Sequence, residues 1–272
     1  MQLLQYLLTA FACCLTTIIQ SQDFDLLLTG GKIVDGSGNS WFYGDVGIKN
    51  GKVAAVGILS QSTASRKIDV SGLIVAPGFI DVHTHIETND LLVPSAPNFL
   101  FDGVTSVVTG NCGGSNTDIT RYFTRLDSVK MGINVATLIG HNSVRHAVMG
   151  DVQRDPTLAE QKQMEDLVAK AMTEGAVGLS TGLIYVPGTY SKMPEVIGLA
   201  KAAAQHNGVY ASHIRDEGDH VTDAIEEAVN IGRVNKMPVE ISHFKVTYKP
   251  NWGRSVSTIE QVEQARRDGI DV

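Results

Sequence analysis

The sequence predicts an α/β protein in which a (β/α)8 barrel, incomplete after about six strands, follows a small N-terminal β-sandwich domain. Short apolar runs broken by turn residues precede Gly72, and longer apolar runs alternate with helical patterns after it. Polar side chains suited to metal binding follow the longer runs. These observations divide the chain into a signal peptide at 1–22, a small sheet domain at 23–72 and an incomplete barrel at 73–272.

The composition is that of a globular protein, because 43% of the 272 residues are hydrophobic and 19% are charged. The net charge is −7, and the basic residues form no block. A negatively charged protein without a basic patch repels phosphate backbones. Nucleic acid is therefore not expected as a partner.

The first 22 residues are typical of a signal peptide. Residues 3–19 are apolar, and no Lys or Arg precedes Lys32. This length suits the apolar region of a signal peptide and is short for a membrane span. We therefore expect cleavage near Ser21 and export to the periplasm or the medium. Lipid attachment at Cys13 is the alternative.

Cysteine usage draws attention to Cys112. Cys13 and Cys14 lie in the leader, so the mature chain keeps one cysteine and no internal disulfide. A lone thiol in an oxidising compartment is open to oxidation unless it is buried or bound to a metal.

The small domain is expected to be an antiparallel sheet. Its apolar runs lie at residues 26–28, 33–34, 46–48 and 53–56. Asn50 and Gly51 between the last two runs predict a type I′ hairpin, because both central positions of that turn need positive φ.

The barrel strands are predicted from apolar runs that lack alternation. Such runs suit parallel strands that are buried on both faces. The runs lie at residues 73–82, 104–109, 133–140, 176–180, 209–213 and 239–243.

Helices are predicted between these runs. Thr157 and Glu160 form a capping box that begins one helix, and Gly175 ends it. The same device predicts a helix at 257–269, and an apolar face predicts another at 220–234. Strands alternating with helices indicate a parallel α/β fold.

The position of the polar residues favours a barrel over an open doubly wound sheet. In a barrel, chemistry collects at the carboxyl ends of several strands, whereas an open sheet binds ligands in one crevice. Five polar residues each follow or end a different apolar run: His83, Cys112, His141, His213 and His243.

Several of these residues suit a zinc site. His83 and His85 are two apart, so their side chains point to the same side of an extended strand. Neutral imidazoles and a cysteine thiolate are good zinc ligands. Taken singly, each residue has an ordinary structural explanation, but Cys112, His213 and His243 at equivalent strand ends are hard to explain that way together.

These motifs make the sequence resemble the N-acyl-D-amino-acid deacylases, or D-aminoacylases, of the amidohydrolase superfamily. The Val-Thr-Gly-Asn-Cys-Gly segment that contains Cys112 is the discriminating one, because dihydroorotase and hydantoinase relatives usually bridge their metals with a lysine carbamate. The matching segments are residues 30–36, 77–85, 108–113, 140–145, 178–182, 213–218 and 241–245. The chain corresponds to the N-terminal portion of such a protein.

The resemblance implies a metal-dependent hydrolase barrel and assigns its ligands. Cys112, His213 and His243 would hold one tightly bound Zn²⁺. His83 and His85 would help to form a second, weaker site.

The resemblance also implies a general acid–base aspartate on the final barrel strand, which is expected beyond Val272. Lys245 would pair with the substrate carboxylate as a compact positive charge. His141, Arg145, Tyr185 and Arg215 are expected in loops at the barrel mouth, without an assigned role.

The implied reaction is hydrolysis of the amide bond of a small-molecule N-acyl-D-amino acid by metal-activated water. The products would be a carboxylate and a free D-amino acid. Another amidohydrolase, such as a dipeptidase or a cyclic-amide hydrolase, is the nearest alternative. An inactive zinc-binding fragment is the alternative from a different class.

Overall fold

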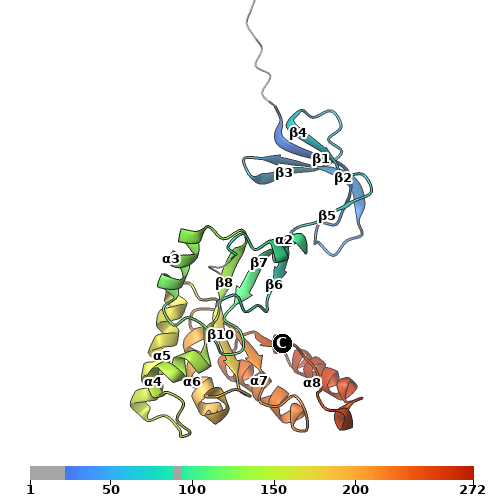
Figure 1. Cartoon of the computed structure of the whole chain (residues 1–272). Helices are drawn as coiled ribbons and strands as arrows, with labels where there is room; N and C mark the ends of the chain where they lie inside the picture. The colour runs from blue at the N-terminus through green and yellow to red at the C-terminus, as the bar shows by residue number, and fades with distance from the viewer. Residues whose placement is uncertain (1–21, 88–92) are drawn as a thin grey trace, which may run out of the picture. The chain divides into compact units, whose positions relative to one another are not determined.

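The computed structural model describes residues 22–87 and 93–272, which form two compact units divided between Pro77 and Gly78 (Figure 1). The predicted signal peptide at 1–22 lies outside the described residues except for Gln22, so it stays a prediction. Among the described residues, no helix is both long and apolar enough to cross a lipid bilayer.

The smaller unit contains one five-stranded sheet in the order β3-β2-β1-β4, and β5 also pairs with β1. Its strands are β1 (Phe24–Ile33), β2 (Phe42–Lys49), β3 (Lys52–Gly57), β4 (Ala64–Asp69) and β5 (Ile74–Val75). The predicted hairpin joins β2 to β3, and Asn50 and Gly51 have φ values of 53° and 71°. This pair of positive φ values suits a type I′ turn.

The expectation of a purely antiparallel sheet is wrong. β1 pairs antiparallel with β2 but parallel with β4 and β5, so the sheet is mixed. Side-chain alternation sets which face of a strand is buried but not the direction of its neighbour. The described residues of this unit form a single sheet, so the β-sandwich stays a prediction.

The larger unit is built from parallel strands in two linked sheets. One has the order β6-β7-β8 and the other β12-β11-β10-β9. The strands are β6 (Phe79–Asp81), β7 (Val104–Thr109), β8 (Asn134–Thr137), β9 (Ile139–Gly140), β10 (Gly178–Gly182), β11 (Val209–His213) and β12 (Val239–Ile241). All pairs in both sheets are parallel, as the apolar runs predict.

Two runs predicted as single strands are each divided. The run at 73–82 gives β5 in the smaller unit and β6 in the larger, so the barrel begins later than residue 73. The run at 133–140 bends at Leu138, whose N–H donates to Thr109 O at 2.9 Å. Thr137 O accepts from Val177 N at 2.9 Å, so this bent run links the two sheets. The complete eight-stranded barrel stays a prediction.

Helices lie around the outside of these strands (Figure 1). They are α2 (Pro97–Phe101), α3 (Ile119–Val129), α4 (His141–Met149), α5 (Leu158–Thr173), α6 (Met193–Ala204), α7 (Val221–Asn235) and α8 (Ser255–Arg267), with 3-10 turns η1 (Gly188–Tyr190) and η2 (Lys249–Asn251). The Thr157–Glu160 capping box is confirmed at the start of α5. The second capping box is wrong, because α8 begins before Ser257, whose hydroxyl donates to Arg254 O.

The main core lies where α4–α7 pack on β9–β12. Leu179 of β10 and Tyr210 of β11 are fully buried there with Ile225 of α7. Beyond α8, Asp271 O accepts from Val239 N at 2.8 Å, so the last residues run beside β12 as a further strand would. This packing holds the carboxyl ends of the strands at fixed positions.

Candidate metal centre

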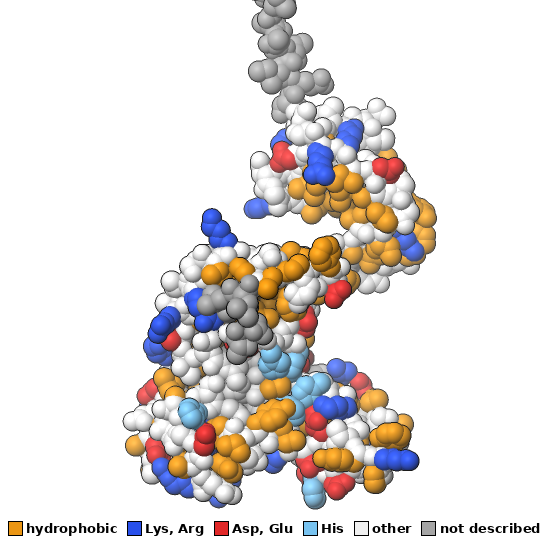
Figure 2. All heavy atoms as spheres, viewed as in Figure 1, with side chains coloured by type: hydrophobic (Ala, Val, Ile, Leu, Met, Phe, Trp, Pro, Cys, Tyr) orange, Lys and Arg blue, Asp and Glu red, His pale blue; other side chains and the backbone are white. Residues whose placement is uncertain are grey.

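Side chains from four strand ends converge in the larger unit. His83 follows β6, Cys112 follows β7, His213 ends β11 and His243 follows β12. Figure 2 shows a patch of neighbouring histidine side chains on one face of this unit, while other histidines lie apart from it. The structure therefore brings together four of the five predicted metal ligands.

The Cys112 thiol lies at the centre of this group. Its Sγ atom lies 3.6 Å from His83 Nε2, 3.7 Å from His213 Nδ1 and 3.8 Å from His243 Nε2. With Zn–S near 2.3 Å and Zn–N near 2.0–2.1 Å, a sulfur and a nitrogen on a tetrahedral zinc are about 3.5 Å apart. The donor types and their spacing therefore fit zinc.

The backbone around Cys112 is closely packed and unusual in conformation. Cys112 has a φ of 53° and Gly113 one of 77°, both in the left-handed region. A Cβ atom on Gly182 would overlap Cys112 O, and one on Gly113 would lie 2.7 Å from Gly182 N. Ser180 Oγ also accepts from Gly113 N at 3.1 Å. These contacts fix the direction in which the thiol points.

Burial sets the protonation of the donors. It lowers the pKa of His83, and it lowers that of His213 to about 4 against the opposing charge of Glu217. Burial, and after it the charge of Glu217, raises the pKa of the Cys112 thiol to about 11. At neutral pH these two imidazoles are neutral and offer lone pairs, whereas a cation must displace the proton of the thiol.

The fifth predicted ligand is placed differently. His85 is exposed, and its ring lies edge-on to that of His83 with 5.2 Å between centroids. Among the described residues, the groups spaced to hold a cation are His83 with Cys112 and His243, and His213 with Glu217 and His243. His85 belongs to neither group.

Glu217 is the residue that the sequence reasoning missed. Its Oε1 atom lies 3.0 Å from His243 Nδ1 and 3.5 Å from His213 Nε2. Lys245 Nζ contacts the same oxygen and lies 2.9 Å from His243 Nδ1. The substrate-binding role of Lys245 stays a prediction. A carboxylate four residues after His213, just beyond a strand, was the available signal for Glu217.

The expectation that His141 and Arg145 line the barrel mouth is wrong. Both side chains are 0% exposed, because α4 packs between the sheet and α5. His141 Nε2 lies 2.8 Å from Glu195 Oε1, and Arg145 Nη1 contacts Glu195 Oε2. Burial works against ionisation of Glu195, but His141 and Arg145 hold its pKa below the usual value.

The other two residues of that group lie nearer the metal centre. The Tyr185 ring is 4.7 Å from that of His213, centroid to centroid. Arg215 binds Glu227 of α7 through Nε and Nη2, both at 2.9 Å. Tyr185 therefore borders the candidate site, whereas Arg215 fastens the loop after β11 to α7.

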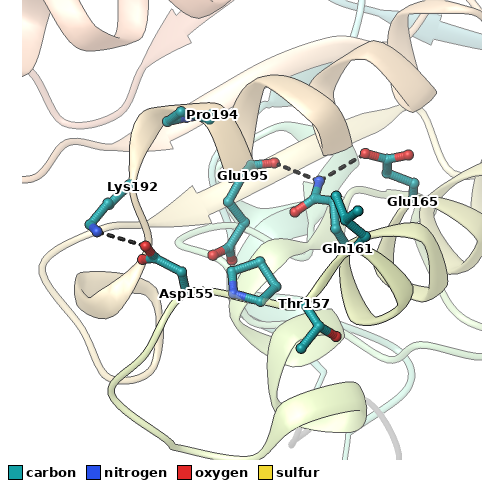
Figure 3. Close-up of a pocket in the computed structure, with 9 residues that line it drawn as sticks. Asp155, Thr157, Gln161, Glu165, Lys192, Pro194 and Glu195 are labelled. Atoms are coloured by element: carbon teal, nitrogen blue, oxygen red, sulfur yellow. Dashed lines mark hydrogen bonds and ion pairs between the residues drawn. The ribbon is translucent and has the colours of Figure 1, made fainter.

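A separate pocket of about 280 Å³ lies beside the first turns of α5 and α6 (Figure 3). Its polar side chains bind one another: Lys192 Nζ lies 2.7 Å from Asp155 Oδ2, and Gln161 Nε2 donates to Glu165 Oε1 at 2.8 Å. These contacts leave little for a ligand to bind. We therefore take the group around Cys112, and not this pocket, as the candidate site.

Comparison with known proteins identifies the family of this chain. The family model described as "Amidohydrolase family" matches residues 66–267. D-aminoacylase from Alcaligenes xylosoxydans xylosoxydans is 41% identical over 268 residues, which is 90% of this chain and 55% of that protein. N-acyl-D-glutamate deacylase from the same organism is 40% identical, with coverage of 92% and 56%. The chain thus spans about half the length of these curated relatives.

Solved structures of related hydrolases are also similar to this chain. N-acyl-D-glutamate deacylase from Bordetella bronchiseptica, crystallised with zinc and a phosphonate mimic of the tetrahedral intermediate, has a TM-score of 0.87 and 40% identity over 92% of this chain and 57% of that one. A D-hydantoinase structure, at a TM-score of 0.66 and 20% identity, shows a shared fold. The resemblance to D-aminoacylases is confirmed, and the chain belongs to the amidohydrolase family.

Proposed function

We propose that this chain provides the zinc-binding part of a hydrolase that cleaves N-acyl-D-amino acids to a carboxylate and a free D-amino acid. The observation that carries the proposal is the contact of Cys112 Sγ with three imidazole nitrogens at 3.6–3.8 Å. Relatives with 40–41% identity are named for hydrolysis of this substrate class.

Cys112, His213 and His243 would hold the tightly bound zinc, and His83 with His85 would serve a weaker site. This division follows the resemblance to D-aminoacylases, because the thiol lies at similar distances of 3.6–3.8 Å from His83, His213 and His243. When bound, zinc would supply Lewis-acid activation of the amide carbonyl and of a water nucleophile.

In the reaction, the water oxygen bonds to the acyl carbon, the C–N bond breaks, and the leaving nitrogen gains a proton. A general acid–base group must carry that proton. The aspartate expected beyond Val272 would fill this role. Lys245, whose side chain is 45% exposed, would bind the substrate carboxylate while remaining beside Glu217.

The test measures zinc content and turnover of N-acetyl-D- and N-acetyl-L-amino acids. It uses this chain and, in parallel, the longest reading frame that contains it. Cys112→Ala is compared with His146→Ala, which removes a histidine whose side chain is 65% exposed. We expect zinc loss in Cys112→Ala only, and turnover of D-substrates only.

Zinc retained in Cys112→Ala would refute the assignment of the metal centre. Turnover of cyclic amides in place of N-acyl-D-amino acids would identify the cyclic-amide hydrolase alternative. Zinc binding without turnover by the longer protein would favour the inactive zinc-binding alternative.

A further inference from the structure

We propose that Glu217 is a positioning residue whose single carboxylate orients two of the metal-binding imidazoles, those of His213 and His243. This inference rests on the proposed metal centre. It concerns how strongly the centre holds a cation and does not depend on which substrate is cleaved.

The two histidines use opposite ring nitrogens toward the thiol. His213 faces Cys112 Sγ with Nδ1 at 3.7 Å, whereas His243 faces it with Nε2 at 3.8 Å. The remaining nitrogen of each ring is the one that lies near Glu217 Oε1, at 3.5 Å for His213 and 3.0 Å for His243. One oxygen thus lies close to both outward nitrogens.

A metal bound at the nitrogens that face Cys112 would require the proton of each neutral ring on its outward nitrogen, next to Glu217. A carboxylate accepts a hydrogen bond from the N–H of a neutral imidazole, which leaves the lone pair on the other nitrogen. At His243, Glu217 Oε1 would accept from Nδ1 across 3.0 Å, and Lys245 Nζ, which can only donate, would give up its 2.9 Å contact with that nitrogen. At His213, Nε2 has no hydrogen-bond partner without a metal, and Glu217 Oε1 is the carboxylate oxygen 3.5 Å from it.

The carboxylate is held where it is needed. The Glu217 side chain is 10% exposed, and burial strengthens a hydrogen bond to it. Glu217 O accepts from Thr247 N at 2.7 Å, while Asp216 Oδ1 accepts from Gly218 N at 2.7 Å. The loop after β11 is therefore fastened on both sides of Glu217.

Glu217 could instead ligate a second cation directly with His213 and His243, because their donor atoms lie close together. Lys245 argues against this. Its ammonium contacts the same Glu217 oxygen and lies 2.9 Å from His243 Nδ1, so a cation at this place would meet a like charge. The outward position of Glu217 is thus better suited to orienting ligands.

The experiment measures zinc affinity by chelator competition, and zinc stoichiometry by elemental analysis, in the longest protein that contains this chain. We expect Glu217→Gln to bind zinc about 10–100-fold more weakly at unchanged stoichiometry, as removal of outer hydrogen-bond partners does elsewhere. Glu226→Gln is the matched control, because it removes the same charge from a side chain that is 54% exposed and paired with Arg233. Its zinc affinity should equal that of the unaltered protein.

Two further variants separate positioning from other effects. Adding Glu217→Gln to Lys245→Met should still weaken zinc binding relative to Lys245→Met alone. If the double variant binds zinc as tightly as Lys245→Met, the weaker binding of Glu217→Gln came only from the unpaired Lys245 ammonium, and the inference is overturned. Glu217→Asp keeps the charge and should bind zinc more tightly than Glu217→Gln. If Glu217→Gln folds poorly, Glu217→Asp is compared with the unaltered protein instead.

Unchanged zinc affinity in Glu217→Gln would overturn the inference, and so would loss of one zinc equivalent, since that is the signature of a ligand. An unaltered protein that binds no zinc would refute the metal centre itself. Turnover of a different substrate class would refute the proposed function and leave the role of Glu217 standing.

Discussion

The metal centre and the buried cluster of His141, Arg145 and Glu195 are built from similar side chains but differ in how charge is paired. In the buried cluster, one carboxylate faces an imidazole and a guanidinium, and its pKa is held low. In the metal centre, the Cys112 thiol faces three imidazoles, and burial raises its pKa to about 11.

This difference shows how to distinguish a structural cluster from a binding site. Buried charges that neutralise one another stabilise a packing arrangement but offer nothing to a ligand. The thiol and the imidazole nitrogens that face one another around Cys112 are suited to bind a cation, and Glu217 and Lys245 lie on the outer side of this group. Burial alone would not show which of His141 and His213 belongs to a binding site, because both side chains are buried.

The largest effect is expected from Arg145→Leu. It leaves Glu195 buried without its guanidinium partner, and breaking a buried pair in this way costs about 3–5 kcal/mol. Urea denaturation should show this loss in the free energy of unfolding, while the folded fraction keeps its zinc affinity. Arg154→Leu, which breaks an exposed pair with Glu160, is the matched control and should change stability far less. A fall in zinc affinity in Arg145→Leu would break the distinction between the two regions.

Gly113→Ala should affect stability and zinc binding together. The φ of 77° is unfavourable for alanine, and its Cβ would overlap Asn142 Oδ1, so we expect a loss of at least about 2 kcal/mol. Displacement of the adjacent Cys112 should also weaken zinc binding. Gly269→Ala is the control, because its φ is 85° but no atom lies within 4 Å of the added Cβ. Equal effects in both variants would show that packing around Gly113 does not position the thiol.

The pH dependence of zinc affinity should follow the thiol. Because the folded pKa of Cys112 is about 11, binding below that pH releases one proton, and apparent affinity rises about tenfold per pH unit as the solution becomes more basic. The rise should stop above about pH 11. His213, whose pKa is about 4, releases none near neutrality. Isothermal titration in buffers of different ionisation enthalpy measures the proton release, and Cys112→Ser should abolish it. An affinity that is flat across this range would contradict the proposed thiolate ligand.

The smallest effect is expected from His146→Ala. His146 Nδ1 lies 2.8 Å from Asp151 Oδ1, but both side chains are more than half exposed. Such a pair is screened by water, so the free energy of unfolding should change by less than about 0.5 kcal/mol and zinc affinity should not change. A larger loss would show that histidine–carboxylate contact matters even without burial.

The fold was predicted well where local signals decide it. The Thr157–Glu160 capping box is found, and each predicted run contains a strand, although the runs at 73–82 and 133–140 are each divided. The second capping box failed at Ser257, because the turn at Gly253 and the contacts of Arg254 with Gly218 and Asp219 begin α8 earlier. The parallel direction of β4 relative to β1 was also missed, since this pairing joins residues about 40 positions apart.

By itself, the sequence determined which donor atoms are available and that they follow strand ends, because a strand places its side chains with a period of two. Only the tertiary structure decided which donors meet. Cys112 and His213 are 101 positions apart, and His141 finds Glu195 54 positions away. The same residue type thus becomes a metal ligand or part of a buried charge pair according to the partners that packing brings to it. Local sequence cannot specify those partners, because the contacts depend on how separate helices and strands pack together.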